Sequence, residues 1–400
     1  MTQDETWTRS AIITIGLCLL ATILEGMDIQ AVGVAGPKIV AEFQLSRSTA
    51  GLLFSVGPLG LFFGAVIGGW ASDRIGRKPT LIGSVAMFGA LSVLTAMSWN
   101  TPSLVILRFL TGLGLGGAMP NLIALVSECS PARWKRALTT ALWVGTPIGG
   151  MAVAQLARDL PDWRPIFFIG GVGPLLLTPL MMWLLPGGAP PATDHKGHAA
   201  KVFQILFGAG RVGPTLLLWT AFFCTLLLLH LLLNWLPLLI IGQGHAPSLA
   251  ATAAVWFNFG GIVGTVLFAL CLAFWAPRLL LGVVYAGMAI SLFSLASVGA
   301  LPQPVLVAAF AAGTFVIGGP FILYGMAPEL YPAETRGAGV GAAIAAGRAG
   351  SVCGPAVVGL LLAQGLSPST VLLGGIPLAV VAGLGALICF QRSPRPTTLP

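Results

Sequence analysis

Two carboxylates interrupt an apolar segment near the start of the chain. Glu25 and Asp28 occur in the stretch LEGMDIQ, which is flanked by apolar and small residues. Their i, i+3 spacing places both side chains on one face of a helix. A charged group inside a membrane span is costly unless it faces a cavity or a partner, and a desolvated or crowded acid can take up a proton. Glu25 and Asp28 are therefore predicted to couple a transport process to protons.

Two arginines supply the complementary chemistry. Arg108 and Arg348 are the two basic residues that lie inside predicted spans. At ~1.5 Å per helical residue, Glu25 and Arg108 come to nearly the same depth, and Arg348 comes to about the middle of its span. Arginine offers a permanent forked donor to a carboxylate, so both arginines are predicted to bind an anionic substrate. The alternative is a structural ion pair between helices with no transport role.

Amide and aromatic side chains in the same spans are further candidates for contact with a substrate. Asn121 and Gln30 are predicted substrate ligands, although intramembrane amides also join helices. Trp143 and Tyr324 have rings that can stack on an aromatic substrate, but the lipid interface is the more typical place for Trp and Tyr. His230 is a further titratable group within a span, and no acid lies near it in the sequence.

The elements that must position these residues follow from composition. Only 8% of the 400 residues are charged, 56% are hydrophobic, and the mean hydropathy is +0.93. Apolar windows of about 20 residues, enough to cross a ~30 Å hydrocarbon core, recur along the chain. We predict an all-α polytopic membrane protein with twelve transmembrane helices. The windows are 11–34, 50–71, 80–98, 103–126, 138–157, 165–185, 214–236, 250–275, 279–299, 303–327, 338–362 and 369–390.

The positive charges indicate how these helices cross the membrane. Of the 20 lysines and arginines, 14 fall on one side of the twelve-span arrangement and four on the other. By the positive-inside rule both termini are then cytoplasmic. The net charge of +8 is explained by this asymmetry, so no nucleic-acid partner is predicted. The N-terminal residues lack a basic region before the first apolar run, and no cleavable signal is expected.

A polar segment near the middle divides the chain into two halves. Residues 186–212 are rich in Pro, Gly and charge and are predicted to be a cytoplasmic linker between six-helix bundles at 1–185 and 213–400. The halves also resemble each other, since ECSPA at 128–132 matches ELYPA at 329–333. The same offset of 201 residues relates Gly117 to Gly318. Parallel repeats of this kind are typical of transporters that bind substrate between the halves.

Two glycine-containing motifs resemble signatures of a known family. The predicted cytoplasmic turn at 68–78 reads GGWASDRIGRK, in which Asp73, Arg74, Gly76 and Arg77 are predicted to latch one conformation. This stretch resembles the long signature of the major facilitator superfamily; the alternative is a basic loop without further role. Residues 108–121 read RFLTGLGLGGAMPN, which resembles a motif of proton-coupled members. Its G-x-G-x-x-G lacks the preceding strand that a dinucleotide site requires.

A narrower resemblance covers nearly the whole chain outside the linker and tails. The first span contains GMDIQAVGVAGPKI, which resembles the aromatic acid:H+ symporter family, and within it the 3-(3-hydroxyphenyl)propionate group. That family usually has Asp where this chain has Glu25. The resemblance implies the major facilitator fold and alternating-access import of an aromatic carboxylate with protons across the bacterial inner membrane. It also implies gating or folding roles for Glu128, Glu329 and Arg336.

Other functions are open or excluded at this point. The open alternatives are symport of another organic anion, such as a sugar acid, and drug/H+ antiport, because VGTPIGG at 144–150 resembles part of an antiporter motif. The chain contains no H-E-x-x-H or G-x-S-x-G motif and is predicted not to be an enzyme. The six cysteines show no C-x-x-C spacing, so neither a metal site nor a cofactor is predicted. The predicted partners are an organic anion, protons and the lipid bilayer, and a monomer is expected.

Overall fold

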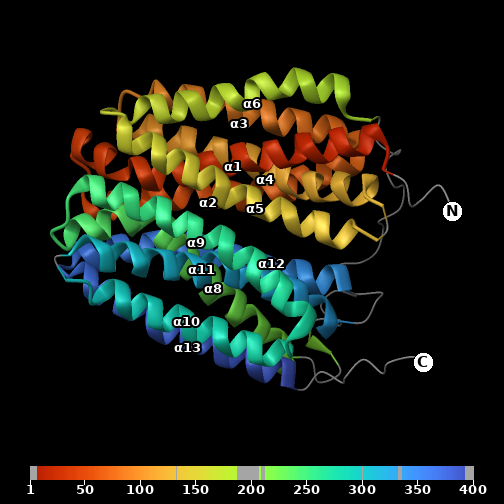
Figure 1. Cartoon of the computed structure of the whole chain (residues 1–400). Helices are drawn as coiled ribbons and strands as arrows, with labels where there is room; N and C mark the ends of the chain where they lie inside the picture. The colour runs from red at the N-terminus through yellow and green to blue at the C-terminus, as the bar shows by residue number, and fades with distance from the viewer. Residues whose placement is uncertain are drawn as a thin grey trace.

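Long helices make up most of the part of the protein that the structure describes. The computed structural model describes residues 7–131, 133–186, 207–208, 212–299, 301–331 and 336–391, and these contain no strand. Within them, twelve helices are long and apolar enough to span a membrane, which confirms the predicted all-α polytopic fold (Figure 1). The helices are α1 Arg9–Glu42, α2 Arg47–Ile75, α3 Arg77–Ala96, α4 Thr101–Cys129, α5 Lys135–Asp159, α6 Arg164–Leu184, α8 Val212–Gly242, α9 Pro247–Phe274, α10 Pro277–Ala296, α11 Pro302–Met326, α12 Arg336–Ala363 and α13 Pro368–Gln391, with a 3-10 turn, η2, at Ala327–Leu330.

The helices form two groups of six. The first bundle, α1–α6, fills the upper half of Figure 1, and the second bundle, α8–α13, fills the lower half. Helix α1 begins, and helix α13 ends, at the right of the picture. This end of the molecule is called here the termini side. Most of the predicted linker at 186–212 lies outside the described residues, so the domain boundaries stay a prediction.

The predicted repeat has a counterpart in the packing of glycines. Gly117 of α4 lies against Gly68 of α2, so closely that a Cβ on Gly68 would overlap it. In the second bundle Gly318 of α11 lies in the same way against Gly264 of α9. Glycine lets two helix backbones approach closely in a membrane, where small residues line helix interfaces. The pair of glycines separated by 201 residues thus makes the same kind of contact in each bundle.

The helices are longer than the apolar windows predicted. Lys38, which falls between the predicted windows 11–34 and 50–71, is inside α1. Its ammonium group donates a hydrogen bond of 2.8 Å to the carbonyl of Ala157 and another to the carbonyl of Leu160. These carbonyls belong to the end of α5, where helix carbonyls lack partners within the helix. The ammonium group of Lys38 therefore has hydrogen-bond partners inside the helix. The predicted window, which follows hydropathy alone, stops before α1 does.

The turn motif at 68–78 is mostly helical. α2 continues to Ile75 and α3 begins at Arg77, so a single residue, Gly76, makes the turn. Gly76 has φ +93°, a left-handed backbone conformation that glycine adopts without steric cost. Arg77 forms a salt bridge with Glu128 at the end of α4. The motif therefore ties the termini-side ends of α2, α3 and α4 together.

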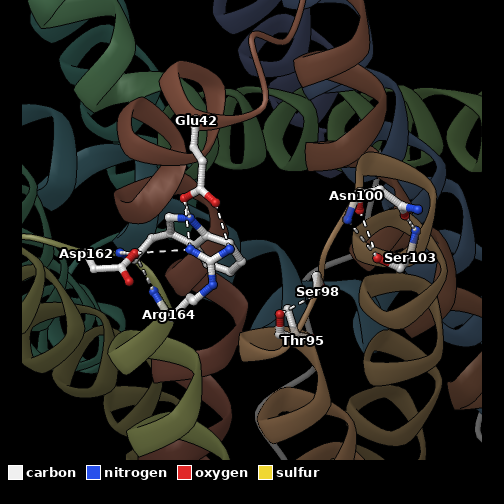
Figure 2. Close-up of polar contacts among 8 residues, drawn as sticks. Glu42, Thr95, Ser98, Asn100, Ser103, Asp162 and Arg164 are labelled. Carbon is white, nitrogen blue, oxygen red and sulfur yellow. Dashed lines mark hydrogen bonds and ion pairs between the residues drawn. The ribbon is translucent and has the colours of Figure 1, made fainter.

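The opposite end of the first bundle is held by polar contacts (Figure 2). The guanidinium of Arg164, at the start of α6, donates to the two carboxylate oxygens of Glu42 at 2.7 and 3.0 Å. Trp163 adds a 2.6 Å hydrogen bond from its indole N–H to Glu42. Asn100 and Ser103 form a reciprocal capping box at the start of α4. These contacts fix the ends of the helices that carry Asp28 and Arg108.

Candidate functional site

Glu25 and Asp28 are brought to the centre of the molecule by close packing of α1 on α5. A Cβ on Gly26 would overlap the backbone of Thr146 in α5, so only glycine permits this approach. The approach removes the neighbouring carboxyls from solvent, since Glu25 is 0% and Asp28 1% exposed. Both side chains must therefore find a protein partner or face an internal cavity.

Asp28 has its partners within the first bundle. Its two carboxylate oxygens accept hydrogen bonds from Arg108 of α4 at 2.9 and 3.2 Å. Ser92 of α3 donates a third bond of 2.6 Å, and the Arg108 guanidinium lies 5.2 Å from the ring centre of Phe167 in α6. Arg108 is 2% exposed. The structure thus joins two predicted site residues in a buried ion pair built by four helices.

Glu25 faces a cavity between the two bundles. The cavity has an empty volume of about 690 Å³, a figure that includes space open to solvent. Of the predicted substrate ligands, Gln30 and Arg348 line it, whereas Arg108 and Asn121 do not. The lining residues are Glu25, Ile29, Gln30, Leu61, Met119, Trp143, Thr146, Pro147, Leu226, Leu229, His230, Leu233, Ile317, Pro320, Phe321, Tyr324 and Arg348.

The two charged groups of the cavity come from opposite bundles. Neither carboxylate oxygen of Glu25 has a hydrogen-bond partner. Arg348 of α12 interacts electrostatically with Glu25, His230 and Tyr324. No salt bridge or hydrogen bond joins its guanidinium to any residue in the described part of the chain. The cavity therefore contains an acid and a permanent cation whose hydrogen-bonding capacity is left for a ligand.

Aromatic side chains form one wall of the cavity. Trp143 of α5 stacks on Tyr324 of α11, with ring centres 5.6 Å apart and planes 13° from parallel. Phe321 lies 5.6 Å from Trp143, centre to centre. The prediction that Trp143 and Tyr324 lie at the lipid interface is therefore wrong for both residues. Their residue types are the sole sequence signal, because α5 and α11 meet through tertiary packing.

Several other predicted residues lie away from the cavity. Asn121 donates a 2.8 Å hydrogen bond to the carbonyl of Gly117, one turn back in its own helix. Asp73 is exposed and forms no ion pair with another described residue, and Arg74 lies over the ring of Trp70 at 4.2 Å. Glu329 is exposed in η2. Arg336 begins α12, and its side chain lies outside the described residues.

The two bundles meet beyond the cavity, on the side opposite the termini. Phe54 of α2 packs edge-on against Trp235 of α8 at 5.1 Å between ring centres. The indole of Trp235 donates a 3.0 Å hydrogen bond to the carbonyl of Pro355 in α12. Gly51 lies against Gly359, and a Cβ on either would crowd the other helix. The cavity is therefore closed at this end by direct contact between the halves.

Comparison with known proteins gives this architecture a family. A model described as Major Facilitator Superfamily matches residues 18–324. The chain belongs to the major facilitator superfamily. It is accordingly a multi-pass membrane transporter of small molecules and not an enzyme. Twelve helices in two bundles with a central cavity agree with the arrangement of secondary transporters built from repeats.

Individual members of the superfamily are similar over almost the full length. The 3-(3-hydroxyphenyl)propionate transporter of Escherichia coli (strain K12) is 41% identical over 385 residues, which cover 96% of this chain and 95% of that protein. A gallate transporter of Pseudomonas putida is 31% identical, covering 93% and 90%. The crystal structure of a D-xylose-proton symporter superposes with a TM-score of 0.80 at 19% identity, covering 96% and 98%, and so shares the fold.

Proposed function

We propose that this protein imports an aromatic carboxylate, 3-(3-hydroxyphenyl)propionate or a close analogue, together with protons. The observation that carries the proposal is the cavity in which unpaired Glu25, the cation Arg348 and an aromatic wall converge from both bundles. The relatives named for 3-(3-hydroxyphenyl)propionate and gallate support it, because both compounds combine an aromatic ring with a carboxylate.

The substrate is held by charge at one end and by its ring at the other. Arg348 donates to the carboxylate, because its guanidinium is the cation that lines the cavity. Trp143 and Tyr324 bind the ring by stacking, a contact worth about 0.5–1.5 kcal/mol beyond area burial. Gln30 lines the same space, and its amide provides a further hydrogen bond to the substrate.

Glu25 carries the coupled proton. An ionised carboxylate without hydrogen bonds is costly in this buried position, so a proton and the substrate anion enter the cavity more favourably together than either alone. Asp28 is the second proton-coupling residue, because its protonation would weaken the pair with Arg108. Arg108 can contact the substrate only in a state in which that pair has opened.

Transport proceeds by alternating access of the two bundles at 1–185 and 213–400, joined by the linker at 186–212. Both termini are cytoplasmic, in a bacterial inner membrane, and the working unit is a monomer. Contacts such as Phe54–Trp235 then close the periplasmic side. The salt bridge Arg77–Glu128, with Asp73, Arg74, Gly76, Glu329 and Arg336 at the same side, belongs to the cytoplasmic gating machinery.

The role of Arg348 is tested by counterflow of labelled 3-(3-hydroxyphenyl)propionate in proteoliposomes. Arg348→Gln is expected to weaken apparent affinity about 10- to 150-fold, since hydrogen bonds to a charged group contribute about 1.5–3 kcal/mol. Arg158→Gln, which alters a 46% exposed side chain at a helix end, is the control and keeps wild-type affinity. Unchanged affinity in Arg348→Gln would remove this residue from the site.

A further inference from the structure

His230 has a defined hydrogen-bonding pattern inside the cavity. Its ring Nδ1 lies 3.0 Å from the carbonyl oxygen of Leu226, one turn back in α8. A carbonyl oxygen can only accept, so Nδ1 carries the hydrogen in this bond. In a neutral imidazole the other nitrogen, Nε2, then has no hydrogen and presents a lone pair.

This lone pair is available to a ligand. His230 lines the cavity, the residue is 6% exposed, and no described residue donates a hydrogen bond to Nε2. Arg348 is the neighbouring charge from α12, and Glu25 faces the same space from α1. An unpaired acceptor on a buried side chain favours a ligand that brings a hydrogen-bond donor.

We propose that Nε2 of His230 accepts a hydrogen bond from a ring hydroxyl of the substrate and selects hydroxylated aromatic acids over their unsubstituted analogues. This inference rests on the proposed transport of aromatic carboxylates and adds the recognition of a second functional group. The lone pair repels a carboxylate, so the substrate cannot reverse its orientation without placing two acceptors together. Within one cavity, Arg348 thus requires an anionic group on the substrate, and His230 requires a neutral hydrogen-bond donor.

Thr146 provides a second unsatisfied group near this position. Its hydroxyl is buried without a hydrogen-bond partner and lines the cavity from α5. A hydroxyl both donates and accepts, so Thr146 can accommodate either a phenol or a water molecule. It therefore does not by itself discriminate against a ligand that lacks a donor. The discrimination belongs to His230, whose free nitrogen only accepts.

The test compares two ligands that differ by one hydroxyl group. Binding of 3-(3-hydroxyphenyl)propionate and of 3-phenylpropionate is measured by calorimetry on the purified full chain, as wild type, His230→Leu and His230→Gln. Wild type is expected to prefer the hydroxylated acid about tenfold, the effect of one net hydrogen bond. In His230→Leu the preference falls to about one while 3-phenylpropionate binds as before, and His230→Gln, whose amide oxygen accepts, keeps part of it.

Two controls separate the possible outcomes. His245→Leu, outside the cavity, keeps the wild-type preference. The methyl ether of the hydroxylated acid, which cannot donate, is expected to bind wild type no better than 3-phenylpropionate, and this measurement needs no variant that must fold. Equal loss of both ligands in His230→Leu, or an unchanged preference, would overturn the inference. Equal affinity of the wild type for both acids would overturn the inference about His230 but not the proposed function. If the wild type bound neither acid, both would be overturned.

Discussion

Removing one partner of the Asp28–Arg108 pair should destabilise the fold far more than removing both. Arg108→Gln leaves the Asp28 carboxylate buried with its bond from Ser92 but without a counter-charge. Asp28→Asn leaves the guanidinium of Arg108 in the same position. The double variant contains two neutral amide groups, so neither buried charge remains.

The magnitude follows from burial and geometry. The side chains are 2% and 0% exposed, and the oxygens accept at 2.9 and 3.2 Å. Breaking one side of such a pair costs about 3–5 kcal/mol, because an uncompensated charge remains buried. Replacing both charges is often close to neutral, so the double variant should recover most of that loss. The exposed pair Arg158–Asp159, at 46% and 63%, should contribute about 0–1 kcal/mol.

The assay is the free energy of unfolding of each purified variant in detergent micelles, arranged as a double-mutant cycle. Arg158→Gln, Asp159→Asn and their combination form the matched control cycle at an exposed site. The coupling energy at Asp28–Arg108 should exceed that of the control cycle by about 2 kcal/mol or more. Additive losses at Asp28 and Arg108 would refute the argument that the pair exists to neutralise two buried charges.

Three further substitutions test the cavity wall, the closed end and the turn. Trp143→Leu should weaken binding of the aromatic acid about 2- to 13-fold, measured by competition, and leave an aliphatic acid unaffected. Gly51→Leu should block closure against α12 and abolish most uptake, whereas Gly57→Leu on the same helix, where a Cβ meets open space, should retain it. Gly76→Ala should lower the free energy of unfolding by about 1–2 kcal/mol because of its positive φ, while Gly83→Ala, with no close neighbour at Cβ, should not.

The spans were predictable because a membrane imposes a length on apolar segments. Each of the twelve helices contains a window long and apolar enough to cross the bilayer. The ends were less predictable, as Lys38 illustrates. Its contacts with the carbonyls of Ala157 and Leu160 depend on a helix more than a hundred positions away in the chain. A local hydropathy window contains no information about such a contact.

The depth of the site residues in the membrane was predictable from sequence, but the partner that each side chain contacts was not. The rise per residue brought Glu25 and Arg108 to one level, yet the structure pairs Arg108 with Asp28. Two acids at i, i+3 share one face of a helix. Which of them contacts α4 depends on how α1 packs against α5 at Gly26. The stack of Trp143 on Tyr324 likewise depends on contact between the two bundles. Residue type and spacing on one helix do not contain that information.

The most direct test of proton-coupled aromatic acid import is uptake of labelled 3-(3-hydroxyphenyl)propionate into proteoliposomes, with and without an inward proton gradient. Wild type should accumulate the acid only with the gradient, and benzoate should compete while a sugar acid should not. Glu25→Gln should exchange the acid without accumulating it, because the buried carboxyl that takes up the proton is gone. Wild-type accumulation in the absence of the gradient, or full gradient-driven accumulation by Glu25→Gln, would contradict the proposed coupling.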